Sequence, residues 1–239
     1  MNPISACPRC GSQELRKNGK VRGRQRHLCQ SCGYNFTVPK LGKAKPIEIQ
    51  RQALHLYLEG MSFRGIERLL GISHVTVMKW VRRWGKAIQR LRKKQKPVKV
   101  EEVEIDELCT LVAQKKSRLW VWVGVDRRGR KVLDFVVGGR GERTGRRLYY
   151  RLRQYRPGIH YTDHWRAYPA VLPASRHRAC KGETYTVESV NSLIRHYLAR
   201  FRRRIRCFSR SVEMVVYSLE LLFFLKVNGG WLEQLPILS

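Results

Sequence analysis

Acidic residues are scarce in this sequence. The 239 residues include 18 Asp and Glu against 49 Lys and Arg, which gives a formal net charge of +31. The basic residues are spread along the whole chain, so the surplus favours a polyanionic partner. Nucleic acid is the first candidate, because each phosphate that a protein neutralises releases counterions.

Long apolar runs are also missing. The longest run, residues 221–225, is far shorter than the roughly 20 residues that span a bilayer. We find no signal peptide and no lipidation motif, which argues against a membrane as the polyanion. With 43% hydrophobic residues, the chain can form a core, and we expect a soluble, folded, intracellular protein of one large domain or two to three small ones.

Four of the cysteines are paired in a way that predicts a metal site. Cys7-x2-Cys10 is followed, after 18 residues, by Cys29-x2-Cys32. Four thiolates at this spacing can close a tetrahedron around one structural Zn²⁺. Two disulfides are the alternative, but they would require an oxidising compartment. The spacing therefore predicts a zinc ribbon over residues 1–40.

The segment between the cysteine pairs reads as a basic hairpin. Asn18-Gly19 is a strong turn signal, and we expect it to join two strands. The basic side chains of this segment are candidates for DNA contact: Arg16, Lys17, Lys20, Arg22, Arg24 and Arg26.

After a linker at residues 38–46, the pattern becomes helical. A first helix is expected to end at Gly60, and Ser62 begins a second, short one. Gly71-Ile72-Ser73 forms a tight turn, and Ser73 caps the next helix. Two short helices joined by a turn that contains Gly predict a helix-turn-helix DNA-binding domain over residues 45–96. The side chains expected to meet the DNA groove and its phosphates are His74, Thr76, Lys79, Arg82 and Arg83.

A different composition follows. Residues 86–99 read as a basic bridge, and strands then dominate, with a hairpin that turns at residues 127–130. A helix at residues 144–155, a short buried strand that ends in Asp163 and a long helix at residues 184–201 come next. This order predicts an α/β fold with a mixed sheet and flanking helices over residues 98–239.

The helix at residues 184–201 combines an apolar face with a polar one. Its apolar residues recur at helical spacing and predict one buried stripe: Val187, Val190, Leu193, Ile194, Tyr197, Leu198 and Phe201. Glu188, Asn191 and Arg195 are expected to share the opposite face, and Thr184 or Thr186 to cap the helix.

Three carboxylates fall where such a sheet would gather them. Asp106 lies inside the first strand, Asp163 at the end of the fourth, and Glu188 near the start of the long helix. Carboxylates brought close together repel one another unless a cation lies between them. Oxygen ligands favour Mg²⁺ or Mn²⁺, and two such ions can promote an in-line displacement at phosphorus.

Other residues compete for these places. Asp126 borders the hairpin turn and Asp134 suits an exposed strand position, so we interpret both as structural. Glu183 competes with Glu188 but precedes the helix. His160 and His164 flank Asp163 and are further candidates for metal contact.

The chain resembles the DDE transposases, and more narrowly the insertion-sequence-one family of bacterial elements. The resemblance runs from Cys7 to about Asn228. It is carried by I-D-E at 105–107, G-E-R-T at 141–144, T-D-x-W-x-x-Y at 162–168, E-x-x-N-x-x-x-R at 188–195 and F-S-R-S-V-E at 208–213.

The resemblance implies a ribonuclease-H-like catalytic domain whose metal-binding triad is Asp106, Asp163 and Glu188. Arg195 takes the place of a basic residue that contacts DNA near the cleaved phosphate, and we expect Asn191 and Arg202 to contact DNA as well. The implied activity is cleavage at the element ends and joining of the freed 3′ hydroxyls to target DNA. Such a protein would act in the cytoplasm, at the nucleoid of a bacterium or archaeon, as a dimer or larger assembly on DNA.

Two other hypotheses remain open at this stage. One is a DNA-binding repressor that keeps the ribbon and the helix-turn-helix but has lost catalysis. The other is a ribonuclease-H-like nuclease that cuts DNA without joining ends. The apolar segment at residues 212–227 is expected either to cover the sheet or to form a dimer contact.

Overall fold

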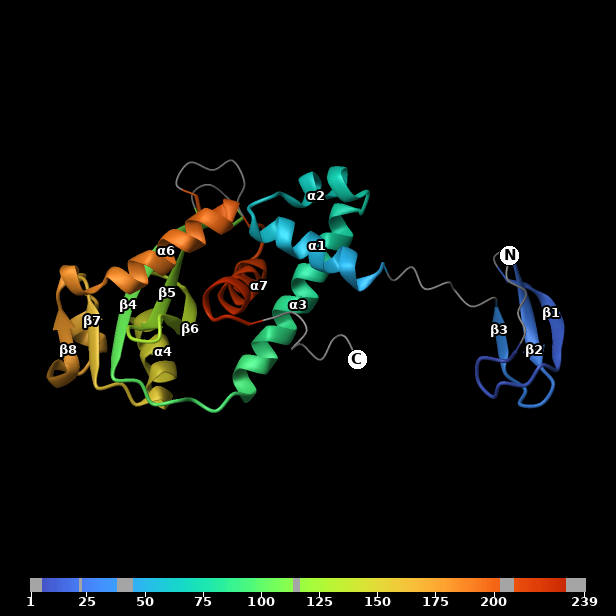
Figure 1. The fold of residues 1–239 in the computed structure, drawn as a ribbon, viewed down its shortest axis with the longest axis horizontal. Helices are drawn as coiled ribbons and strands as arrows, with labels where there is room; N and C mark the ends of the chain where they lie inside the picture. The colour runs from blue at the N-terminus through green and yellow to red at the C-terminus, as the bar shows by residue number, and fades with distance from the viewer. Residues whose placement is uncertain (1–5, 22, 38–44, 114–116, 203–208, 231–239) are drawn as a thin grey trace. The chain divides into compact units, whose positions relative to one another are not determined.

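The structure is a computed structural model that describes residues 6–21, 23–37, 45–113, 117–202 and 209–230. The chain forms two compact units, Met1–Pro46 and Ile47–Ser239 (Figure 1). Predictions that concern Arg22 or residues 38–44 of the linker lie outside the described residues.

The first unit contains a three-stranded antiparallel sheet in the order β1-β2-β3. Its strands are β1 Leu15–Val21, β2 Arg24–Cys29 and β3 Asn35–Thr37. The predicted hairpin is present, but its turn is not at Asn18-Gly19. Val21 pairs with Arg24, and Gly19 lies within β1, where the register shifts. Gly19 has a φ of 69°, a conformation that suits a bulge as well as a turn, so the sequence pattern did not distinguish the two.

The second unit begins with three helices. These are α1 Ile47–Leu58, α2 Phe63–Leu70 and α3 His74–Lys94. The predicted cap at Ser73 is confirmed, because its hydroxyl accepts a hydrogen bond of 3.3 Å from the backbone N–H of Val75. Ser62, predicted to begin α2, caps it by accepting a hydrogen bond of 3.0 Å from the backbone N–H of Gly65. Gly71 ends α2 with a φ of 62°, the left-handed conformation that glycine adopts without strain.

Helix α3 is longer than the sequence indicated. Residues 86–94, interpreted as part of a bridge, continue the helix to Lys94. The reason is packing, because Trp84 and Ile88 on this part of the helix are buried. Their spacing of four residues places them on one face, and basic side chains occupy the rest of the helix surface.

A five-stranded mixed sheet follows, in the order β6-β5-β4-β7-β8. Its strands are β4 Glu102–Leu111, β5 Arg118–Asp126, β6 Lys131–Gly138, β7 Ile159–Thr162 and β8 His177–Ala179. Strands β4, β5 and β6 pair antiparallel, whereas β7 runs parallel to β4 and to β8. The predicted hairpin between β5 and β6 is confirmed.

Helices cover both faces of this sheet (Figure 1). Helices α6 Tyr185–Tyr197 and α7 Val212–Leu222 pack on one face, against residues such as Leu108 and Val123. Helices α4 Glu142–Leu152 and α5 Tyr168–Val171 pack on the other, around Ile105 and Trp122. The helix predicted at residues 144–155 is therefore α4 together with a short 3₁₀ turn, Arg153–Tyr155.

Helices α1–α3 share their core with the sheet domain. Trp84 of α3 belongs to the same buried apolar cluster as Val190 of α6 and Leu219 of α7. Helices α3 and α7 approach so closely that a Cβ atom at Gly85 would lie 2.5 Å from the Cβ atom of Tyr217. The boundary predicted near residue 97 therefore does not separate two independent hydrophobic cores.

Buried ion pairs reinforce this contact. Arg92 of α3 lies 2.8 Å from Asp134 of β6 and 2.8 Å from Glu220 of α7. Burial raises the pKa of Glu220, and the Arg92 guanidinium opposes that shift. The prediction that Asp134 is exposed is wrong, because Asp134 is only 4% exposed. The apolar residues on either side of it reflect a buried position in the strand.

No helix within the described ranges is both long and apolar enough to cross a bilayer.

Candidate active site

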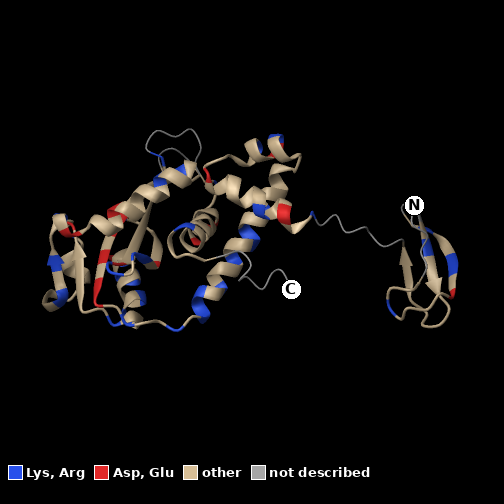
Figure 2. Ribbon diagram, viewed as in Figure 1, with Lys and Arg blue, Asp and Glu red and all other residues tan. Residues whose placement is uncertain are grey.

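Strand β4 presents acidic side chains to both faces of the sheet. Alternate residues of a strand point to opposite faces, so Glu104 and Asp106 lie on the α6 face and Glu107 on the α4 face. Figure 2 shows the resulting acidic stretch on a strand of an otherwise basic protein. This strand holds the first predicted carboxylate.

Asp106 is tied directly to helix α6. The Asn191 side-chain amide donates a hydrogen bond of 2.7 Å to Oδ2 of Asp106. Burial raises the pKa of Asp106 to about 6, and the charges of Glu107 and Asp163 add to the increase. Asp106 is therefore a crowded carboxylate at which negative charge accumulates.

Asp163 follows directly on the last residue of β7, which lies beside β4 in the sheet. Its Oδ1 atom accepts a hydrogen bond of 2.9 Å from the backbone N–H of Trp165. Its charge helps to raise the pKa values of both Asp106 and Glu107. The structure thus brings the two predicted aspartates within electrostatic reach of each other.

Glu188 lies in the first turn of α6 and is exposed. It accepts a hydrogen bond of 3.2 Å from the Thr184 hydroxyl and lies one turn before Asn191. Within the described ranges, the four cysteines are the only group of three or more metal-ligating side chains close enough to share an ion. The structure therefore places Glu188 on the helix that contacts Asp106, but does not bring the three carboxylates to ligand distance of one another.

The start of α6 is held by a buried carboxylate and not by a threonine. Oε2 of Glu104 accepts a hydrogen bond of 2.8 Å from the backbone N–H of Val187. The Thr184 hydroxyl makes no cap hydrogen bond, and within the described hydrogen bonds Thr186 has no side-chain partner. The predicted threonine cap is wrong, because an anion from β4 satisfies this helix N-terminus.

Arg127 joins the acids near this helix start. Its guanidinium lies 3.5 Å from Glu104 and pairs with Glu183. It also lies over the rings of Tyr161 and Tyr185, at 4.6 and 5.0 Å from the centroids. Glu183 therefore has a cationic partner, which argues against it as the third metal ligand.

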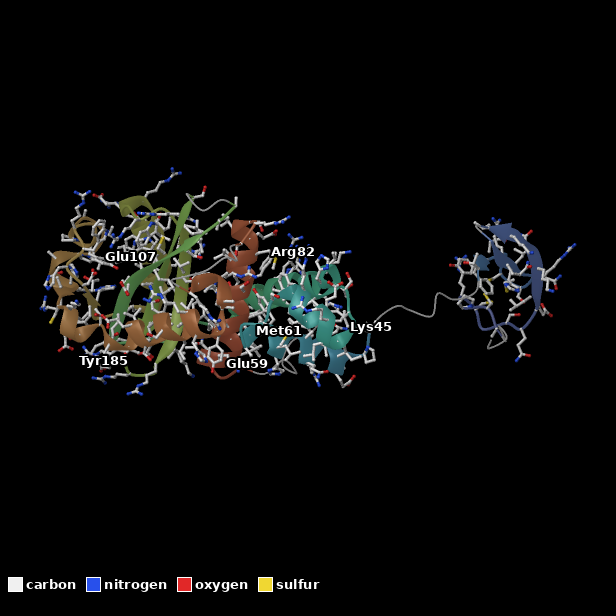
Figure 3. All side chains as sticks on the ribbon, turned by 90° about the horizontal axis from the view of Figure 1, so that it is seen from above. Lys45, Glu59, Met61, Arg82, Glu107 and Tyr185 are labelled. Atoms are coloured by element: carbon white, nitrogen blue, oxygen red, sulfur yellow. The ribbon has the colours of Figure 1, made fainter. Side chains whose placement is uncertain are left out.

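Glu107 is a site residue to which the sequence assigned no role. It accepts hydrogen bonds from the Tyr168 hydroxyl at 2.6 Å and from Arg140 at 3.0 Å. The Arg140 guanidinium lies between two indoles, 3.8 Å from the ring centroid of Trp165 and 4.4 Å from that of Trp120. Figure 3 labels Glu107 on one side of the sheet and Tyr185, at the start of α6, on the other.

This cluster connects the first two carboxylates. Glu107 is adjacent to Asp106 in β4, and Trp165 hydrogen-bonds to Asp163 through its backbone. Glu107 belongs to the motif I-D-E, and Trp165 and Tyr168 belong to the motif T-D-x-W-x-x-Y. The sequence therefore showed these three residues as parts of a pattern. Nothing in that pattern indicated that they contact one another.

The competing acids have local structural partners. Asp126 accepts a hydrogen bond of 3.1 Å from the backbone N–H of Arg128 in the β5–β6 turn, and Asp134 pairs with Arg92. His160 is buried, which lowers its pKa, and lies 3.4 Å from the backbone oxygen of Arg176. His164 is exposed.

The four predicted cysteines are gathered at a single point in the first unit. Their sulfur atoms all lie within 4.8 Å of one another, with Cys7 and Cys32 at 3.8 Å and Cys10 and Cys29 at 3.6 Å. Sulfur atoms around a tetrahedral zinc with bonds of about 2.3 Å would be roughly 3.8 Å apart. The cluster therefore has the dimensions of a Zn²⁺ site.

The residues predicted to read DNA lie along the first half of α3. His74 pairs with Glu67 at 2.8 Å, and Arg82 donates a hydrogen bond of 3.2 Å to the sulfur of Met214 in α7. Lys79 is exposed and Thr76 is partly exposed. Arg83 is exposed as well.

Three further predicted DNA contacts belong to α6 and the segment after it. The expectation that Asn191 shares an exposed face with Arg195 is wrong, because Asn191 is 3% exposed. Its side-chain nitrogen donates to Asp106, whereas among the described residues its buried side-chain oxygen has no hydrogen-bond partner. Arg195 is partly exposed, and Arg202 is exposed and donates to the backbone oxygen of His196 at 3.4 Å.

Known families match both parts of the second unit. The family described as IS1 transposase matches residues 100–224, and the homeodomain-like domain matches residues 46–92. The second match agrees with the observed helix-turn-helix of α2 and α3, a fold that binds DNA.

Individual relatives agree with the first match. The insertion element iso-IS1n protein InsB of Shigella dysenteriae is 32% identical over 111 residues, which cover 46% of this chain and 85% of the relative. The insertion element IS1 protein InsB of Shigella flexneri is 33% identical over the same shares. A match to the crystal structure of a pre-cleavage Mos1 transpososome covers 77% of this chain and 74% of the matched chain. At 12% identity and a TM-score of 0.32, it supports no conclusion. The IS1 transposase match spans more than half of the chain, and the chain therefore belongs to the IS1 transposase family.

Proposed function

We propose that this chain is a DDE-type transposase that cleaves DNA at the ends of an insertion element and joins the 3′ hydroxyls to target DNA. In this proposal the catalytic residues are Asp106, Asp163 and Glu188. The observation that carries it is the hydrogen bond from Asn191 to Asp106. It fixes the helix that bears Glu188 over the strand that bears Asp106.

The order of the sheet supports a ribonuclease-H-like arrangement. Three antiparallel strands are followed by two that run parallel to the first, β7 and β8. Asp106 lies on the central strand β4 and Asp163 at the end of its parallel neighbour. The parallel register pairs Glu104 with Tyr161, so Asp106 and Asp163, each two residues further along the chain, fall at the same level of the sheet.

The donor set fits hard divalent cations. Asp106, Asp163 and Glu188 would hold Mg²⁺ or Mn²⁺, which prefer carboxylate oxygens. The fit rests on the crowding of negative charge at Asp106, which a cation would neutralise. Two bound ions would stabilise the attacking and leaving oxygens of a displacement at phosphorus.

The protein's own task at this site is to hold the carboxylates in place. Asn191 orients Asp106 by binding Oδ2, and Glu104 anchors the first turn of α6. Glu107 and Arg140 hold the segment after Asp163 through the ring of Trp165. Errors of about 1 Å in such sites can reduce rates by two orders of magnitude.

DNA binding is assigned to other parts of the chain. We propose that α3 reads the element ends through His74, Thr76, Lys79, Arg82 and Arg83, and that Arg195 and Arg202 contact DNA near the cleaved phosphate. The first unit would hold one structural Zn²⁺ and add a further DNA contact. A transposase acting on chromosomal DNA would work at the nucleoid and assemble as a dimer or larger oligomer on paired ends.

The test is a cleavage and joining assay with the full chain. Asp106→Asn, Asp163→Asn and Glu188→Gln preserve shape but each removes one charge that would hold metal. We expect each to reduce cleavage and joining by at least about a thousandfold, several kcal/mol of transition-state stabilisation. Binding of end DNA should stay nearly unchanged.

Matched controls make the assay decisive. Asp126→Asn and Glu183→Gln remove the same charge from acids with local partners and should leave cutting intact. If Glu183→Gln is inactive while Glu188→Gln joins ends, the third carboxylate is misassigned. If all three triad variants are active, a DNA-binding repressor without catalysis replaces the proposal, and cleavage without joining in the native chain would indicate a nuclease.

A further inference from the structure

Helix α4 has an exposed basic face that no part of the proposed function uses. The segment from Arg143 to Arg156 contains six arginines and no acidic residue, and Glu142 is the only acid of the helix. All six arginines are exposed. Figure 2 shows the corresponding basic positions along α4, which can be located with Figure 1.

The exposed residues form one stripe. Thr144, Gly145, Leu148 and Leu152 face the sheet. Arg143, Arg147 and Tyr150 follow one another at spacings of four and three residues, and Arg146, Tyr150 and Arg153 form a second row with Tyr150 in common. Tyr150 is 63% exposed, so an aromatic ring stands at the centre of the arginines.

Much of this charge is not neutralised by the protein. Arg146 pairs with Glu142 at 3.5 Å, and Arg151 pairs with Asp134 at 3.4 Å. Among the described residues, Arg143, Arg147 and Arg153 have no ion-pair partner. These three side chains are available to an external polyanion.

The stripe begins near the candidate active site. Arg140, two residues before α4, contacts Trp165, whose backbone binds Asp163. From Arg143 to Arg153 the stripe is about 15 Å long at 1.5 Å per residue. One strand of duplex DNA carries about four phosphates over that length.

The DNA-reading end of α3 lies elsewhere. His74 precedes Arg92 by 18 residues, roughly 27 Å of helix, and it is Arg92 that shares Asp134 with α4. A duplex bound by the first turns of α3 would therefore lie at a distance from the arginine stripe on α4. Joining requires a second duplex, and arginines that contact phosphates can bind a duplex without reading its bases.

We propose that the exposed face of α4 and of the 3₁₀ turn after it, formed by Arg143, Arg146, Arg147, Tyr150 and Arg153, binds the phosphate backbone of target duplex DNA. The proposal rests on the transposase function above, since that function requires a second duplex. It assigns target binding to the sheet face opposite α6 and end recognition to α3.

The test measures binding of a duplex without element ends to the full chain at several salt concentrations. The variant Arg143→Gln/Arg147→Gln/Arg153→Gln keeps good helix formers and removes three charges. We expect affinity to fall by about tenfold or more, and the slope of log K against log salt to fall by about 2 to 3. Arg147→Gln alone should reduce the slope by about 1.

The control removes the same charge elsewhere. Arg176→Gln/Arg178→Gln/Lys181→Gln neutralises three exposed basic residues around β8 and should leave the slope nearly unchanged. In the joining assay, the α4 variant should lower the ratio of joined product to cleaved ends. Equal slopes for the two triple variants, or an unchanged ratio, would overturn the proposal. Active triad variants would instead defeat the proposed catalytic function, while the measured duplex binding would still stand.

Discussion

The two units of this chain are stabilised in different ways. Within its described residues, the first unit has a buried apolar cluster of only Cys7, Cys29 and Phe36, with Leu15 and Cys32 packed against it. The second unit has a continuous core that includes residues of α1, α3, α6, α7 and the central strands. One unit must be stabilised by something other than apolar burial, and the other need not be.

The difference also shows how the helix-turn-helix is stabilised. Small modules bury too little surface to fold alone and depend on metals or disulfides. The helix-turn-helix has no such need, because it packs on α7 and shares ion pairs with β6. Helix α3 and the sheet that carries the two aspartates therefore belong to one compact unit.

Removal of zinc should have the largest effect and should act on one unit alone. Chelation, or Cys10→Ser, is expected to unfold the first unit completely, because binding of a structural metal supplies its folding free energy. Limited proteolysis should then cut within residues 1–46, while the heat unfolding of the second unit stays the same. Reduced protein that contains no zinc and still resists proteolysis there would contradict this expectation.

Loss of Arg92 should have the next largest effect, confined to the second unit. Arg92→Met leaves Asp134 and Glu220 buried without their shared cation, so we expect a loss of about 3 kcal/mol in unfolding free energy. Chemical denaturation measures this loss. Replacing Arg92, Asp134 and Glu220 together by apolar residues of similar volume should recover most of the lost free energy. If stability is not recovered, unpaired buried charge is not the cause of the loss.

A smaller effect is expected at the contact between α3 and α7. Gly85→Ala places a methyl group against Tyr217 and should cost roughly 1–3 kcal/mol by overpacking. Gly65→Ala in α2, where the new atom meets the flexible Met61 side chain at 3.0 Å and the Ser62 hydroxyl at 3.3 Å, should be neutral or stabilising by up to about 1 kcal/mol. If both variants unfold at the same temperature, the close approach of α3 and α7 is not present in solution.

The sequence predicted best what is decided locally. The cysteine pairs, the start of α2 at Ser62, the Ser73 cap and the β5–β6 hairpin depend on a few neighbouring residues, and the sequence predicted each from them. The α/β order of elements also followed from local patterns. The turn at Asn18-Gly19 failed because one glycine conformation serves both turns and bulges.

The site was predictable only in part, because its contacts join distant residues. Asp106 and Asp163 stood out as single carboxylates at strand positions. The hydrogen bond between Asn191 and Asp106 links residues 85 positions apart, so helical spacing alone placed Asn191 on the wrong face. Glu104 resembled any other strand carboxylate until its bond to the start of α6 was seen.

The most direct test of the central claim is to locate the metal that the three carboxylates would hold. Fe²⁺ can replace Mg²⁺, and with an oxidant it cuts the backbone near its binding site. In the zinc-loaded chain bound to end DNA, we predict cuts close to Asp106, Asp163 and Glu188, identified by mass spectrometry and removed by excess Mg²⁺. Cuts near the two aspartates with none in the first turn of α6 would contradict the account, because Glu188 would then lie outside the metal site.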